Sequence, residues 1–169
     1  MVGELVEERL FKRHVRNTWS VQDWQLHRWA YARLMERVDK QIGVILDALD
    51  ASGQAEKTVV ILTSDHGDHD GSHGLEHKTV LYDEAARVPW LMRYPGKIPE
   101  GTVRDDCLVS TGLDLMATCC DYAGVAQPAH CLGLSLRDAA EAGAALPREV
   151  VVSNTGNRLL RVTLCAGGC

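Results

Sequence analysis

The pattern of apolar and polar positions predicts a long amphipathic helix over residues 25–51. Apolar side chains recur there at three- and four-residue steps, and charged side chains fall mostly on the other faces. The apolar positions are Val38, Ile42, Ile45, Leu46 and Leu49. Ser52-Gly53 follows, with a glycine where a left-handed residue ends a helix, so we expect the helix to stop there.

Two short apolar runs predict strands. Residues 58–63 are nearly all apolar or β-branched, which is typical of a strand buried on both faces in a parallel sheet. Residues 88–94 form the second run, closed by the turn signal Pro95-Gly96. Pro89 lacks a ladder donor, so it should lie at the entrance of this strand or next to an irregularity.

Patterns typical of helices and strands also occur in the rest of the chain. Residues 111–122 predict a helix, and residues 150–152 and 159–164 predict a hairpin around residues 154–157. One side of this predicted helix carries the apolar residues Leu113, Met116, Ala117 and Cys120. The order of helices and strands indicates an α/β layered fold.

The richest chemistry lies directly after the first predicted strand. Asp65 and His66 follow residues 58–63, at the end of a strand where α/β proteins bind ligands. A carboxylate and an imidazole both present lone pairs, so together they suit a divalent cation. Lys78 comes after a glycine-rich loop that is long enough to fold back, and its ammonium suits a sulfate or phosphate oxygen.

Other interpretations of these residues stay open at this point. Asp65 and His66 could serve only as a turn cap and a single hydrogen-bonding group, and Lys78 could be an ordinary surface lysine. A rival metal site would place His69, His73 and His77 on one helix face, although three glycines make a helix costly there.

Composition narrows the function classes. The 169 residues are 24% charged and 46% apolar, with 23 acidic and 18 basic residues interspersed, so no basic stripe predicts a nucleic-acid partner. No apolar run is long enough to cross a bilayer and no secretory signal is visible, so we expect a soluble, cytoplasmic protein without a membrane partner. Six cysteines without zinc-type spacing favour free thiols, with Cys119 and Cys120 buried in a helix.

The motifs in order resemble the C-terminal half of the catalytic domain of type I sulfatases, in the alkaline phosphatase superfamily. The resemblance extends over about residues 24–124. It is carried by the segments 63–67, 71–75, 81–84, 87–89 and 94–99, by Lys78 and by the helix before them. It implies an alkaline-phosphatase-like α/β/α sandwich of which only the C-terminal portion is present, with residues 1–24 of uncertain role and residues 25–169 as a partial sulfatase-like domain.

The resemblance also implies roles for single residues. Asp65 and His66 match the pair that completes a divalent cation site, usually calcium, with Mg²⁺ or Mn²⁺ as alternatives. Lys78 matches the lysine that contacts the sulfate ester, and is thus both the catalytic and the substrate-binding residue expected here. Tyr82, Asp83, Glu84 and Arg87 match positions that support the loop.

One expected feature does not occur in these 169 residues. Sulfatases use a formylglycine made in a Cys/Ser-x-Pro-x-Arg motif, and no cysteine or serine here has that context. We therefore expect the nucleophile in upstream sequence, and no activity from this chain alone. The alternatives are a phosphodiester or phosphonate monoester hydrolase of the same superfamily, or a non-catalytic remnant that binds a partner. Exposed sheet edges would favour self-association or a complementary fragment.

Overall fold

A computed structural model describes residues 19–78, 80–153 and 162–165 of the chain. These residues belong to two compact units. The first unit consists of residues 1–52 and 66–88, and the second of residues 53–65 and 89–169. Among the described residues, no helix is both long enough and apolar enough to cross a membrane.

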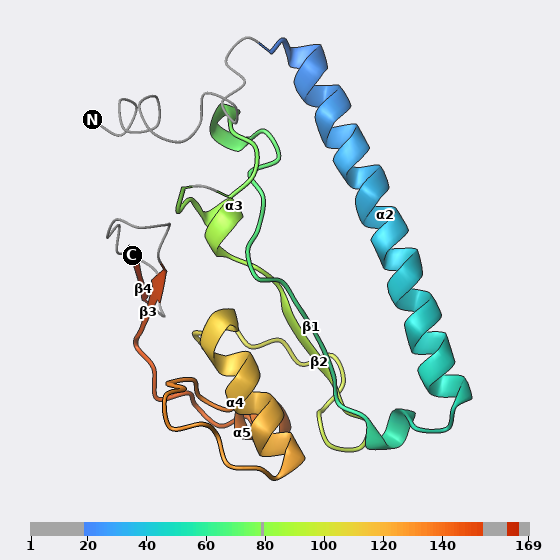
Figure 1. The fold of residues 1–169 in the computed structure, drawn as a ribbon, viewed down its shortest axis with the longest axis vertical. Coiled ribbons are helices and arrows are strands. Elements are labelled where there is room, and N and C mark those ends of the chain that lie inside the picture. The colour runs from blue at the N-terminus through green and yellow to red at the C-terminus, as the bar shows by residue number, and fades with distance from the viewer. Residues whose placement is uncertain (1–18, 79, 154–161, 166–169) are drawn as a thin grey trace. The chain divides into compact units, whose positions relative to one another are not determined.

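The first unit is dominated by one long helix, α2, which spans Val21–Ala51 (Figure 1). It begins four residues earlier than the periodicity predicted, because Ser20 and Asp23 form a capping box. The Ser20 amide donates to Asp23 Oδ2 at 2.8 Å, and the Asp23 amide donates to Ser20 Oγ at 3.2 Å. The helix ends as expected, with Gly53 in the left-handed region at φ 69°.

Several large apolar side chains of α2 are exposed in the part of the chain that the structure describes, whereas Ile42, Leu46 and Leu49 are half-buried. No residue of α2 is buried. The most exposed apolar side chains are Val21, Val44, Ile45, Leu26 and Trp29, at 60–70% exposure. A long helix in a protein is normally stabilised by packing that covers its apolar side chains.

Two short helical turns complete the first unit. The 3₁₀ turn η2 spans Ser72–Gly74, and α3 spans Asp83–Ala86. Between them runs the segment that carries Lys78, and Ala85 in α3 is buried at 6% exposure.

In the second unit, β1 (Val60–Thr63) pairs with β2 (Trp90–Arg93) after the 3₁₀ turn η1 (Ala55–Lys57). The pair is antiparallel, with Ile61 opposite Met92, so the expected parallel neighbour is wrong for these two strands. The strands are half-buried to exposed instead of buried on both faces. Pro89 lies just before β2 as predicted, and its carbonyl accepts a hydrogen bond from Thr63 Oγ1 at 2.9 Å.

The helix α4 (Thr111–Ala123) has the predicted position, and Gly124 ends it at φ 65°. Its buried side differs from the predicted one. Asp114, Ala117, Thr118 and Cys120 are buried, whereas Leu113 and Met116 are 46% and 53% exposed. Cys119 is exposed, so only Cys120 of the adjacent cysteines is a buried thiol.

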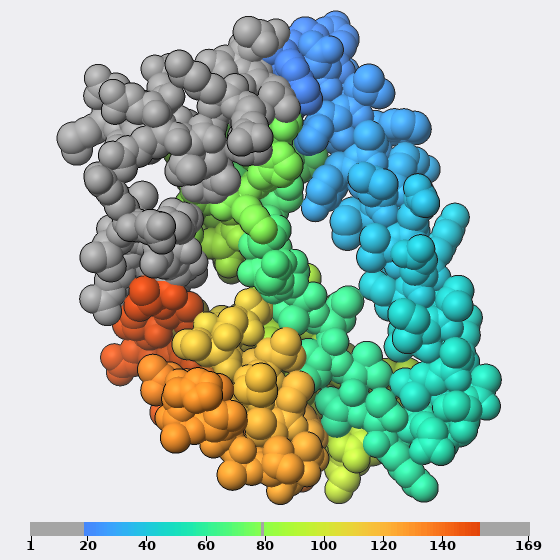
Figure 2. All heavy atoms as spheres, viewed as in Figure 1, coloured from blue at the N-terminus to red at the C-terminus, as the bar shows by residue number. Residues whose placement is uncertain are grey.

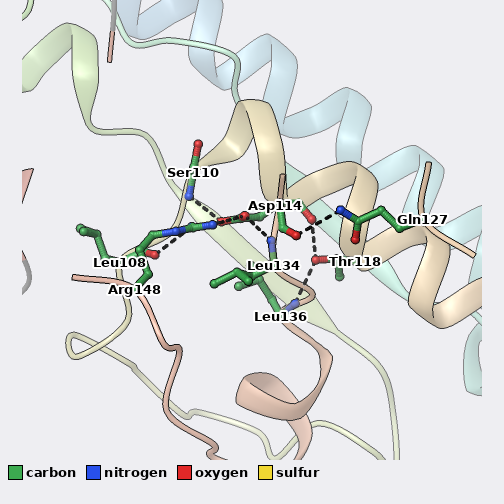
Figure 3. A network of polar contacts seen from close by, with 9 residues as sticks. Leu108, Ser110, Asp114, Thr118, Gln127, Leu134, Leu136 and Arg148 are labelled. Carbon is green, nitrogen blue, oxygen red and sulfur yellow. Dashed lines mark hydrogen bonds and ion pairs between the residues drawn. The ribbon is translucent and has the colours of Figure 1, made fainter. Parts of the chain in front are cut away.

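A polar network explains why Asp114 and Thr118 are buried (Figure 3). The fully buried Asp114 carboxylate accepts from Arg148 through both guanidinium nitrogens and from the backbone amides of Ser110 and Leu134, at 2.7 and 2.9 Å. Thr118 Oγ1 accepts from the Leu136 amide at 3.1 Å. The carboxylate is satisfied on all sides, so its burial is not penalised in the way that an unpaired charge would be.

The network holds together the segments that follow α4. The chain returns through residues 127–136 into α5 (Arg137–Ala142), and Figure 2 shows α4 to α5 as one contiguous body, gold to orange. The strand β3 (Val150–Ser153) then pairs antiparallel with β4 (Val162–Cys165). The predicted hairpin is confirmed, and its turn lies outside the described residues.

Candidate functional site

The loop that follows His66 begins with an anchor on α3. The Gly67 amide donates to the Ala85 carbonyl at 2.9 Å. A Cβ atom at position 67 would lie 1.9 Å from the Glu84 carbonyl oxygen, so only glycine allows this approach.

The loop then folds on itself through backbone hydrogen bonds. His69 N donates to His77 O at 2.8 Å, and Gly71 N donates to Leu75 O at 2.9 Å. Positive φ angles at Asp70, His73 and His77, of 43°, 59° and 67°, break any helical path. The interpretation that placed three histidines on one helix face is therefore wrong.

His66 and Lys78 meet across this loop, twelve residues apart, with Lys78 Nζ in contact with His66 Nε2. His66 Nδ1 lies 2.8 Å from the Gly67 carbonyl oxygen, which only accepts, so Nδ1 carries the proton. The lone pair of His66 therefore lies on Nε2 and accepts from the Lys78 ammonium. Lys78 is exposed and His66 is half-buried, so both groups are accessible.

Asp65 lies two residues beyond the end of β1, at the place that the sequence predicted, and is exposed. Carboxylate and imidazole lone pairs are donors that divalent cations accept. In the part of the chain that the structure describes, no three His, Cys, Asp or Glu side chains are grouped to hold a metal ion. Asp65 and His66 thus fit a cation by donor type, and further ligands would have to come from other residues.

A cluster of rings fills the inside of the loop. The His69 ring is 1% exposed, and neither ring nitrogen makes a hydrogen bond that meets normal geometric limits. It meets Tyr82 edge-on at 5.7 Å between centroids, and His73 stacks on Tyr82 at 4.0 Å. His73 Nε2 lies 3.5 Å from Glu84 Oε1, so Tyr82 and Glu84 contact the loop as the resemblance implied.

Acidification is expected to weaken this loop. Burial lowers the pKa of His69 below its ordinary value of 6.5, against the opposing charges of Glu84 and Asp68, and with His73 acting in the same direction as burial. Since the opened loop then binds more protons than the closed one, loop stability is complete above pH 6.5 and falls as the pH drops below it. An NMR titration of the His69 ring should give a midpoint below 6.5, and a midpoint above it would contradict this cause.

The sequence analysis did not predict that the helix α2 contacts the loop of residues 66–78. Residues 19–24 were left without a role, yet Trp24 lies against the loop at Gly71. The signal in the sequence was a helical spacing of aromatic and basic residues, not of aliphatic ones.

Comparisons with known proteins identify the family. The sulfatase family model matches residues 10–125, and the chain belongs to the sulfatase family, within the alkaline phosphatase superfamily. A Δ4,5-hexuronate-2-O-sulfatase of Bacteroides thetaiotaomicron is 34% identical over 119 residues, which are 70% of this chain and 25% of that protein.

Solved structures agree with this assignment. A crystal structure of a putative sulfatase from Bacteroides thetaiotaomicron matches with a TM-score of 0.75 and 31% identity, over 81% of this chain and 30% of the other. A phosphonate monoester hydrolase from Silicibacter pomeroyi matches with a TM-score of 0.62 and 32% identity, over 69% and 22% of the two chains. The chain thus spans about a quarter of the length of the curated relatives it matches.

Proposed function

We propose that this chain supplies one part of the active site of a sulfuric ester hydrolase. Asp65 and His66 would be two ligands of a divalent cation, Ca²⁺ in first place and Mg²⁺ or Mn²⁺ as alternatives. Lys78 would be the catalytic residue that contacts the sulfate ester. The observation that supports this assignment is the contact of Lys78 Nζ with Nε2 of His66, twelve positions earlier in the chain, in a member of the sulfatase family.

The three side chains would have distinct tasks. The Gly67 carbonyl holds the proton on His66 Nδ1, which leaves the lone pair on Nε2. In the structure this lone pair accepts from Lys78, and it would bind the cation once the Lys78 ammonium turns to the sulfate ester. The exposed Lys78 ammonium would bind a sulfate oxygen and offset negative charge that grows as the ester bond breaks. A bound cation would polarise the ester oxygens. The formylglycine nucleophile and the remaining ligands would come from sequence outside these 169 residues.

Anion binding tests this function directly in the chain itself. Inorganic sulfate, titrated in the presence of Ca²⁺, should shift the NMR signals of the Lys78 side chain and the His66 ring. Lys78→Ala should abolish the shift at His66, because it removes the only charge proposed to bind the anion, while Lys97→Ala, at an exposed lysine of the second unit, should leave it unchanged. A sulfate response at His66 that survives Lys78→Ala would contradict the assignment.

A second candidate reaction is phosphonate monoester or phosphodiester hydrolysis. It is supported by the similarity to the phosphonate monoester hydrolase, since a cation and a lysine also suit phosphoryl oxygens. Parallel titrations with sulfate and phenylphosphonate would separate the two, because stronger binding of the phosphonate would favour this second reaction.

Exposed apolar side chains on α2 support a partner for this chain. Side chains such as Leu26, Val44 and Ile45, 65–67% exposed, would be covered by a second copy or by a complementary sulfatase segment. Size-exclusion chromatography of the chain should therefore show association, and a monomer at high concentration would argue against it.

A further inference from the structure

The N-terminal third of α2 continues the face of the predicted apolar stripe with aromatic and polar side chains, since Trp24, Tyr31, Val38 and Ile45 are spaced by seven residues. His27, Arg28 and Tyr31 lie three, four and seven residues after Trp24, so the four side chains share one side of the helix. All four lie in the first unit, together with the loop of residues 66–78.

Trp24 lies directly on the tip of this loop. A Cβ atom at position 71 would be 2.8 Å from Trp24 Cε3, and Gly71 has a φ of 90°, so glycine is required for both reasons. The indole is itself held by Trp19, edge-on at 4.7 Å between ring centroids, and by His27 at 5.8 Å. The close approach of helix and loop is thus specified by an aromatic side chain and a glycine together.

Asp70, next to this glycine, is held from the same helix face. Its Oδ1 lies 3.5 Å from His27 Nε2, and its Oδ2 lies 3.5 Å from Arg28 Nε. The Asp70 side chain is 22% exposed, which keeps its ion pair with Arg28 partly shielded from water. Burial and the charges of Asp68 and Asp70 raise the pKa of Tyr31, as expected for a phenol beside the same carboxylates.

Hydrogen bonds connect the tip of the loop, at Asp70, to the two ends of the loop. The Asp70 amide donates to Asp68 Oδ1 at 2.8 Å, and the bond from His69 N to His77 O joins the two limbs. His77 directly precedes Lys78, and Asp68 lies two residues beyond His66. Fixing the tip therefore restricts the positions of His66 and Lys78.

We propose that the Trp24–His27–Arg28–Tyr31 face of α2 positions the loop that brings His66 and Lys78 together, with Asp70 as the positioning residue. This inference rests on the proposed function in one respect, namely which ligand His66 and Lys78 bind. The positioning itself is a property of the chain and can be measured without any ligand.

The test removes the charge of Asp70 and keeps its shape. Asp70→Asn suits the positive φ of 43°, which asparagine tolerates, so the backbone is not strained by the change. Hydrogen exchange in the peptide of residues 66–78 should become about three- to tenfold faster, as for the loss of a partly buried ion pair. The ring ¹⁵N signals of His66 should shift as its contact with Lys78 loosens. The matched control is Asp47→Asn, at an exposed position of α2.

A second variant covers the case in which Asp70→Asn does not fold. Arg28→Gln changes a side chain that is 68% exposed, so the fold survives, and it should reproduce both effects more weakly, while Arg28→Lys should restore the His66 signals. Faster exchange with unchanged His66 signals would overturn the proposal, because Asp70 would then only stabilise the loop. Unchanged exchange in both variants would overturn it too. The sulfate titration of the unsubstituted chain tests the proposed function separately.

Discussion

Replacing Asp114 with alanine is expected to lower the free energy of unfolding of the second unit by about 3–5 kcal/mol. The Asp114 side chain is fully buried, and Arg148, which binds it through two nitrogens, is only 11% exposed. The substitution would leave the Arg148 guanidinium buried without its counter-charge, and the amides of Ser110 and Leu134 without their acceptor. Both losses act on the segments that hold α4 in place.

Native-state hydrogen exchange of residues 111–123 measures this effect within the second unit. The matched control is Asp105→Asn, at an exposed position, for which we expect a change within about 0.5 kcal/mol. A loss below about 1 kcal/mol for Asp114→Ala would show that the network does not stabilise the unit as described.

Gly67→Ala is expected to have the largest effect on the candidate site. The added methyl group would lie 1.9 Å from the Glu84 carbonyl oxygen, which is backbone and cannot rotate away. The loop would have to leave α3 and give up the hydrogen bond from Gly67 N to Ala85 O, at a cost of about 2–3 kcal/mol. Since the Gly67 carbonyl also fixes the proton of His66, the His66 ring should lose its orientation.

Hydrogen exchange of the peptide of residues 66–78 measures the change in the loop. The ¹⁵N signals of the His66 ring measure the change in its orientation. Gly43→Ala is the control, because nothing lies within 4 Å of a Cβ at that helical position. It should stabilise α2 by about 0.5–1 kcal/mol. If Gly67→Ala behaved like the control, the close approach of the loop to α3 would be wrong.

The elements that the sequence predicted correctly are those specified by local signals. The end of α2 at Gly53, the end of α4 at Gly124 and the entry of β2 after Pro89 depend on single residues with restricted or unusual backbone conformations. The direction of pairing between β1 and β2 depends on which strands meet in space, and an apolar run contains no information on that.

The buried side of α4 shows a different limit. Hydrophobicity favoured Leu113 and Met116, but the structure buries Asp114 and Thr118. Their partners, Arg148 and the amide of Leu136, come from 34 and 18 residues further along the chain. A polar side chain is buried when distant groups satisfy it, which a helical period cannot reveal.

The residues of the candidate site were proposed from the sequence, whereas the contacts that support its loop were not. Asp65, His66 and Lys78 were identified from their order after a strand and from the resemblance to sulfatases, and the structure brings His66 and Lys78 into contact. Their roles stay a prediction. The anchoring of the loop by Trp24 and Asp70 was missed, because it depends on a contact between a helix face and a left-handed turn that local patterns do not encode.

The contact between His66 and Lys78 is the central claim, and a nuclear Overhauser experiment tests it most directly. In the chain labelled at lysine and histidine, we expect a cross-peak between the His66 ring protons and the Cε protons of Lys78. The ring proton of His66 should be found on Nδ1, as its contact with the Gly67 carbonyl requires. The absence of this cross-peak in the folded chain, with the loop amides still protected from exchange, would contradict the account.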